Sequence, residues 1–205
     1  MTHNILEKLF GGPARVKIMK LFLFNDEQTF DKEDVQNRAK VNSSDATKEL
    51  KLLNDIKLLK KKQLTKIKKT KTGRTSKRKT QGYYLNPNFG LLKHLRNLVI
   101  NNEPLQHDDI SKRVGKAGKI KLIIISGVFL QNEDSRLDLL IVGDQIKDRS
   151  LKNIISTMEA DIGKELRYSS LSTSNFKYRL SVCDRLTRDV LDYQHEVVVD
   201  RIGLN

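Results

Sequence analysis

Between Asp55 and Glu103 the chain carries no carboxylate, although it is densely charged there. Residues 60–79 alone hold eleven Lys and Arg. The first hundred residues contain 23 Lys and Arg against 9 Asp and Glu, a net charge of +14, whereas residues 101–205 contain 16 of each kind. A positive field this concentrated favours a polyanionic partner, because each cation that meets a phosphate releases condensed counterions. The pattern therefore indicates nucleic acid as the partner of the first half.

A run of like charges can also be a solvated, disordered tail. Here the run is internal, and apolar residues recur at regular spacing on both sides of it. The hydrophobic content of 38% is gathered in dense blocks, and 205 residues are enough for two small domains with a core each. We therefore expect an ordered basic segment within a folded chain.

The sequence also bears on the compartment. Met1–Lys8 lacks the basic-then-apolar layout of a signal peptide, and the longest apolar stretch, residues 122–130, is too short to cross a bilayer. Cys183 is the only cysteine, so no internal disulfide can form, which is compatible with a reducing cytoplasm. We expect a cytoplasmic protein with no membrane partner.

Apolar periodicity and capping residues predict three helices before residue 60. The first is Pro13–Phe24, because the fixed φ of proline suits a helix start. Asp31 is expected to cap a second helix that runs through Ala39, and Ser43 or Ser44 to cap a third after a short turn. The order is helix, turn, helix.

The third helix is expected to have two distinct faces. Its buried stripe should comprise Ala46, Leu50, Leu53 and Ile56–Leu59, which recur at helical spacing. Its early polar face is expected to point into a major groove, and the alternative is the solvent side of an ordinary helix. The residues predicted to contact bases or phosphates there are Ser43, Ser44, Thr47, Lys48 and Lys51.

The period changes after this helix. Leu64 and Ile67 mark one extended segment, and Tyr83–Leu85 mark another, with a basic, flexible loop between them. Two strands with a basic tip form a β-hairpin that would lay its cations along phosphates as a group, each one individually replaceable. The predicted phosphate contacts are Lys66, Lys68, Lys69, Lys71, Arg74, Lys77, Arg78 and Lys79.

With these elements in place, the first half resembles the winged helix-turn-helix transcription regulators of prokaryotes. The matching motifs are LFGGPAR at residues 9–15, VNSSDATKELK at residues 41–51 and YYLNP at residues 83–87. The resemblance implies a dimeric or paired operator binder whose third helix reads bases. Lys57 stands where many relatives have the Gly that closes this helix, and a left-handed Lys would cost about 1 kcal/mol, so the helix is expected to end differently or to continue.

The fold class that we expect is α+β. A winged helix-turn-helix domain is assigned to residues 1–88, and a helical linker to residues 89–118, where leucines repeat at helical spacing. A small α/β domain follows at residues 119–205. Its apolar runs at residues 120–125 and 137–142 read as buried strands, Ser150 is expected to cap a helix, and residues 165–171 and 197–202 look extended.

The second half resembles the minimal nucleotidyltransferase domain through ISGVF at residues 125–129 and SRLDLLIVGD at residues 135–144. That family holds a triphosphate on a Gly-Ser step and two divalent metals on an Asp-x-Asp pair. Here the step is inverted, as Ser126 and Gly127, and the pair reads Arg136-Leu137-Asp138. A cation at a metal position repels Mg²⁺, and Arg167, not a carboxylate, stands near the third family position. We therefore predict a degenerate site with no catalysis, no metal and no cofactor.

The leading interpretation is a DNA-binding transcription regulator whose second domain serves dimerisation, partner contact or ligand sensing. The expected partners are double-stranded DNA, a second copy of the chain, and a nucleotide or protein at the second domain. Two alternatives stay open: a nucleotidyltransferase that acts on RNA, a small molecule or a protein, and an antitoxin-like interaction protein. The role of Asp138 has two candidates: a structural carboxylate, or a residue that still binds a nucleotide or metal. Arg136 is a candidate for binding an anionic ligand in the same pocket.

Overall fold

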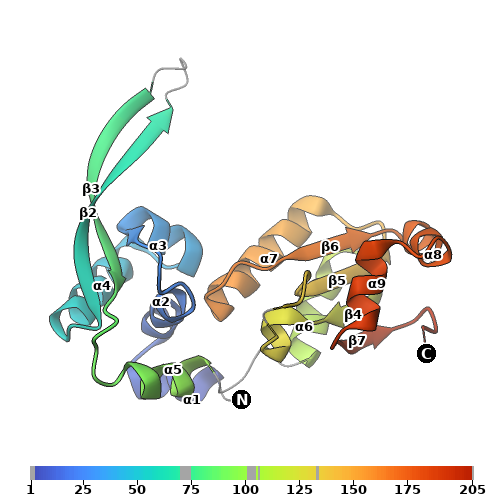
Figure 1. Cartoon of the computed structure of the whole chain (residues 1–205), viewed down its shortest axis with the longest axis horizontal. Coiled ribbons are helices and arrows are strands. Elements are labelled where there is room, and N and C mark those ends of the chain that lie inside the picture. Colours follow the sequence, from blue (N-terminus) through green and yellow to red (C-terminus); the bar gives the residue numbers. More distant parts are fainter. Residues whose placement is uncertain (1–2, 70–74, 101–104, 106, 133, 205) are drawn as a thin grey trace. The chain divides into compact units, whose positions relative to one another are not determined.

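The computed structural model describes residues 3–69, 75–100, 105, 107–132 and 134–204. The chain divides into two compact units, Met1–Asn102 with Glu159–Lys164, and Glu103–Met158 with Glu165–Asn205. Both helices and two separate sheets are present, so the expected α+β class is confirmed (Figure 1). None of the described helices is long and apolar enough to span a bilayer.

The first unit combines helices with a three-stranded antiparallel sheet. Its helices are α1 (His3–Phe10), α2 (Pro13–Phe24), α3 (Lys32–Ala39), α4 (Ser43–Asp55) and α5 (Leu92–Ile100). Its strands are β1 (Phe30–Asp31), β2 (Leu59–Lys69) and β3 (Thr75–Leu85), in the order β1-β3-β2. β2 and β3 form a long hairpin that projects beyond α2, α3 and α4 (Figure 1).

The helix starts follow from local capping chemistry. Pro13 is the first residue of α2, and Asp31 caps α3 through a capping box with Asp34, as the sequence predicts for both starts. The cap of α4 is Asn42, whose side chain accepts a hydrogen bond from the Asp45 N–H, so the expectation of a serine cap is wrong. The side-chain oxygen of Asn42 accepts the hydrogen bond that a serine hydroxyl was expected to accept, and it does so one residue before Ser43.

The end of α4 also differs from expectation. The helix stops at Asp55, and Lys57 adopts a left-handed conformation with φ of +64°. Ile56 is 51% exposed, so it does not belong to the buried stripe predicted for this helix. Leu58 and Leu59 are buried, but they lie beyond the left-handed residue, where the chain turns into β2. The backbone reversal at Lys57 therefore separates the helix from the hairpin.

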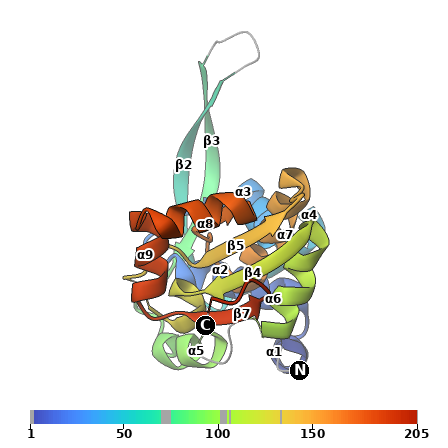
Figure 2. The same cartoon turned by 90° about the vertical axis from the view of Figure 1, so that its right-hand side faces the viewer.

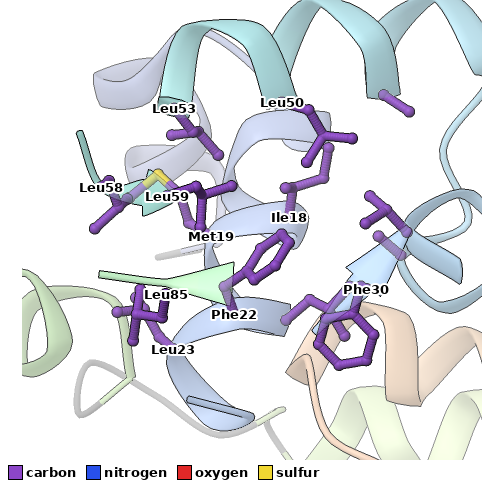
Figure 3. Close-up of a cluster of buried hydrophobic side chains, with 14 of the residues drawn as sticks. Ile18, Met19, Phe22, Leu23, Phe30, Leu50, Leu53, Leu58, Leu59 and Leu85 are labelled. Atoms are coloured by element: carbon purple, nitrogen blue, oxygen red, sulfur yellow. The ribbon is translucent and has the colours of Figure 1, made fainter. Parts of the chain in front are cut away.

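The core of the first unit lies between the helices and the base of the hairpin (Figure 3). Phe22 of α2 contacts Phe30 of β1 edge to face, with ring centroids 5.5 Å apart. Leu50 and Leu53 bring α4 to this cluster, and Leu85 brings the end of β3 (Figure 3). The helical core thus holds the hairpin at its base.

The second unit contains a mixed four-stranded sheet in the order β6-β5-β4-β7. The strands are β4 (Lys119–Ile125), β5 (Leu139–Asp144), β6 (Tyr168–Leu171) and β7 (Glu196–Asp200). The helices are α6 (His107–Val114), α7 (Asp148–Ile162), α8 (Thr173–Ser181) and α9 (Arg185–Asp192), with 3-10 turns at Gly115–Ala117 and Gly127–Leu130. The last four residues of α7 are counted with the first unit. β4 is antiparallel to both its neighbours, while β5 and β6 are parallel, joined by the crossover through α7.

Both faces of this sheet are covered. Phe176 of α8 and Val190 of α9 pack with Leu122 and Leu140 on one face. α7 lies across the other face, and views from two sides agree on this arrangement (Figures 1 and 2). α7 begins at Asp148, so Ser150 lies inside the helix and does not cap it as expected. The segment 89–118, treated as a linker above, is divided: α5 belongs to the first unit and α6 to the second.

Candidate nucleic-acid interface

The polar face of α4 is accessible. Ser43, Ser44, Thr47, Lys48 and Lys51 are all exposed. Ala46, Leu50 and Leu53 occupy the opposite face and are buried in the core. The helical period thus presents all five predicted contact residues of this helix to solvent. Thr47 Oγ1 also donates a hydrogen bond of 2.8 Å to the carbonyl of Ser43, which orients its methyl group and hydroxyl.

An ion pair that sequence reasoning missed holds α4 against α2. The guanidinium of Arg15 grips the carboxylate of Glu49, with Nε to Oε2 at 2.6 Å and Nη2 to Oε1 at 3.3 Å. Glu49 is 6% exposed, so its carboxylate depends on this partner. The sequence did show a charged residue, Glu49, at a core-facing position of α4, which indicates a buried ion pair. It could not show the partner, because Arg15 lies 34 residues away.

The hairpin carries cations without any acid. β2 reads LKKKQLTKIKK and β3 reads TSKRKTQGYYL, which together hold nine Lys and Arg and no Asp or Glu. The register pairs Thr65 with Lys79 and Ile67 with Lys77, so these residues share one face of the ribbon with Lys61. All three of these lysines are exposed. Packing cations this densely costs stability through mutual repulsion, which a polyanion would relieve.

Three of the exposed hairpin cations were missing from the predicted contacts. Lys60, Lys61 and Lys62 lie at the start of β2 and are exposed, as Lys77, Arg78 and Lys79 are on β3. Their signal was present in the sequence, because they begin the same basic run. Of the other predicted contacts, Lys68 and Lys69 lie on β2, and the structure describes only their backbone. Lys71 and Arg74 lie outside the described residues.

Lys66 occupies a different environment from the other hairpin cations. Its Nζ lies 2.8 Å from Asp31 Oδ2 and 2.7 Å from Asp34 Oδ1, at the start of α3. Burial alone would lower the pKa of Lys66, but hydrogen bonds to these two carboxylates and their charges raise it above the ordinary value. Burial likewise pushes the pKa of Asp31 up, but the hydrogen bond from Lys66, the Asp34 N–H and the charge of Lys66 together lower it.

A cavity of about 410 Å³ lies between the hairpin and the starts of α3 and α4. It brings together three of the predicted contact residues: Ser43 from α4, Lys66 from β2 and Arg78 from β3. The full lining is Asp31, Lys32, Glu33, Gln36, Ser43, Lys66, Arg78 and Thr80. One end of α4 and one face of the hairpin therefore border the same space.

In the second unit, Asp138 is enclosed by donors. Its carboxylate is 3% exposed and accepts hydrogen bonds from the Val128 N–H at 2.9 Å and the Arg167 N–H at 2.8 Å. The guanidinium of Arg167 adds two contacts of 3.2 Å, one to each oxygen. Both oxygens are thus occupied by protein donors. The positive charge that balances Asp138 comes from Arg167, which stands near the position where the nucleotidyltransferase resemblance implied a carboxylate.

The other residues of the predicted degenerate site are also engaged. Ser126 Oγ lies 2.7 Å from Ser135 Oγ and 2.7 Å from the carbonyl of Gln194, in a buried position. Arg136 points elsewhere and pairs with Asp189 of α9 at 3.0 Å. Within the described residues, no three His, Cys, Asp or Glu side chains are grouped so as to hold a metal ion. The proposed anion-binding role of Arg136 would have to compete with Asp189.

Comparison of the chain with protein-family models, with curated proteins and with solved structures finds no match.

Proposed function

We propose that the protein is a DNA-binding transcription regulator whose first unit acts as a winged helix-turn-helix. In this proposal α4 enters the major groove through Ser43, Ser44, Thr47, Lys48 and Lys51. The hairpin of β2 and β3 lies along the phosphates beside it. Cations on the hairpin supply affinity, and the polar side chains of α4 supply base contacts.

The observation that carries the proposal is the acid-free hairpin beside the accessible face of α4. The two paired strands hold nine cations and no carboxylate, and of these cations Lys66 pairs with acids of β1 and α3. Lys61, Lys77 and Lys79 share the exposed face of the ribbon opposite the cavity, and Arg78 is exposed on the cavity side. Ser43 of α4 and Arg78 of β3 border one cavity, so the helix and the ribbon are neighbours. This combination suits a duplex, which offers a groove for the helix and a phosphate row for the ribbon.

The second unit is proposed to be a nucleotidyltransferase-like domain without catalysis, which serves dimerisation, partner contact or ligand sensing. The saturation of Asp138 by Arg167 and Val128 supports this, because a metal would have to displace several donors. Incubation with labelled nucleoside triphosphates and Mg²⁺ should give no transfer. Transfer that Asp138→Asn abolishes would overturn this part of the proposal.

A salt titration of duplex binding tests the DNA-binding proposal. The affinity of the full chain for a mixed-sequence duplex should fall steeply with salt, because bound phosphates release counterions. Replacing Lys61, Lys77 and Lys79 together by Gln should weaken binding and reduce the slope of log K against log salt by about 0.9 for each lost contact. Fluorescence anisotropy of a labelled duplex provides the measurement.

A matched triple variant controls for net charge. Lys112, Lys116 and Lys147 of the second unit are also exposed, and their replacement by Gln removes the same charge. This variant should leave the salt slope close to that of the unmodified chain. A flat salt response of the unmodified chain, or equal losses in the two triple variants, would contradict the proposal.

A further inference from the structure

We propose that Lys66 is a clamp that fastens the β2–β3 hairpin to the start of α3 and thereby sets the angle at which the hairpin meets a duplex. The sequence places Lys66 among the phosphate-binding cations, and its contacts assign it this separate task. The statement about duplexes rests on the proposed function. The clamp itself is a property of the first unit alone.

All four carboxylate oxygens of Asp31 and Asp34 have a partner. In the capping box of α3, Asp31 Oδ1 accepts the Asp34 N–H at 2.9 Å, and Asp34 Oδ2 accepts the Asp31 N–H at 3.1 Å. The remaining oxygen of each carboxylate lies within 2.8 Å of Lys66 Nζ. The ammonium of Lys66 therefore binds the two carboxylate oxygens that the capping box leaves over. It also neutralises two neighbouring anions that would otherwise repel each other.

Lys66 lies farther along the hairpin than the backbone pairing that holds its base. Backbone pairing between β1 and β3 reaches Gly82, which lies opposite Lys62 of β2. Lys66 is four residues farther out, about 13 Å at the usual rise of a strand. The hairpin is thus held at two positions along its length, by the backbone pairing of Asp31 with Gly82 near its base and by the ion pair of Lys66, farther out, with Asp31 and Asp34. Two separated tethers restrict bending that one tether at the base would allow.

Lys66 differs from the exposed cations of the ribbon in its surroundings. Its side chain is 30% exposed and pairs with two carboxylates, one of which is 5% exposed. A phosphate could capture Lys66 only if the buried Asp31 and the half-buried Asp34 lost their cation. Arg78 lies directly across the ribbon from Lys66 and remains exposed at the same cavity. With Lys66 neutralised by acids, Arg78 is free of its repulsion and available to a phosphate.

A distance measurement without DNA tests the clamp. Cys183 is replaced by Ser, and cysteines are introduced for spin labels at two exposed positions, Asn37 of α3 and Lys77 of β3. Pulsed electron paramagnetic resonance then gives the distribution of distances between the two labels. Lys66→Gln should broaden or shift this distribution, and Lys66→Arg should restore it because a guanidinium also bridges two carboxylates. Lys79→Gln, which removes an exposed cation of the same ribbon, should leave it unchanged.

Asp34→Asn offers an independent approach from the other side of the ion pair, and it should also broaden the distribution. If Lys66→Gln and Asp34→Asn both retain the distribution of the unmodified chain, the clamp is refuted. The outcome does not depend on whether the chain binds nucleic acid.

Salt titrations then separate positioning from phosphate contact. Lys66→Gln should lower duplex affinity severalfold with the salt slope unchanged, since a poorly oriented ribbon loses preorganisation. Lys79→Gln should lower the slope by about 0.9, the signature of a lost phosphate contact. A loss of slope in Lys66→Gln equal to that in Lys79→Gln would show that Lys66 is a phosphate ligand. If the unmodified chain fails to bind duplexes, the proposed function fails, and the distances alone decide the clamp.

Discussion

At the scale of single residues, the same residue type takes different roles according to its surroundings. Lys66 and Lys79 belong to one basic run, yet Lys66 pairs with two carboxylates and Lys79 is exposed. The sequence could identify both as cations of a hairpin, but not this difference. The acids that engage Lys66 come from a helix start more than thirty residues earlier, so spacing within the run contains no sign of them.

The surroundings of Gly127 in the second unit leave no room for a side chain. The φ of Gly127 is +54°, and a Cβ at this position would overlap Asp138 Oδ1. The carboxylate of Asp138 in turn accepts the Val128 N–H, which follows the glycine directly. Sequence comparison with the nucleotidyltransferase motif drew attention to Gly127 and Asp138, but their contact requires the folded turn.

Gly127→Ala should therefore lower the free energy of unfolding of the chain by about 2–4 kcal/mol, through left-handed strain and displacement of Asp138. Urea denaturation followed by circular dichroism measures this loss. Gly115→Ala is the matched control in the same unit, because no atom lies within 4 Å of its added Cβ and its φ is ordinary. The control should change stability by less than about 0.5 kcal/mol. Equal stability of the two variants would contradict the explanation.

At the scale of elements, helices with local signals were predicted well. α2 and α3 have the expected bounds, because a proline start and a capping box are written in adjacent residues. α1 and β1 were not anticipated. β1 has two residues and exists through its pairing with Tyr83 and Gly82, so the sequence around it cannot reveal it. Local signals predict elements that local interactions stabilise.

The hairpin shows the opposite case. Only Leu64, Ile67 and Tyr83–Leu85 marked strands in the sequence, since lysine is a poor strand former. The structure pairs Leu59 with Leu85 and continues without interruption to Lys69 and Thr75. Buried Leu59 and Leu85 hold the base of the hairpin in the core, and their pairing sets the register of the outer part. The strand length is therefore decided by cross-strand pairing and not by the propensity of each segment.

At the scale of the whole molecule, the charge distribution follows the division into units. The net charge of +14 lies in the first hundred residues, and the first unit extends to Asn102 before its short return segment. The second unit is close to neutral and has a sheet covered on both faces. The proposal that one unit binds a duplex while the other serves a different purpose agrees with this separation, and it remains a prediction.

Selection of bound duplexes from a random pool tests sequence recognition by the complete chain. We expect one preferred sequence to be enriched, with two-fold symmetry if two copies bind together. Thr47→Ala should change the preferred sequence, because its hydroxyl lies on the exposed face of α4, whereas Lys79→Gln should weaken all sequences alike. A bound pool that stays as random as the input would contradict a sequence-reading role for α4.

The sequence by itself determined the concentration of charge, the mixed α+β class and the helices that begin at proline and aspartate caps. These properties depend on composition or on residues within one or two turns of each other. Only the tertiary structure decided that Glu49 is held by Arg15, that Lys66 faces two acids and that Asp138 is saturated by Arg167. Each of these pairs joins residues about thirty positions apart, and such contacts depend on how helices and strands pack, which no local pattern records.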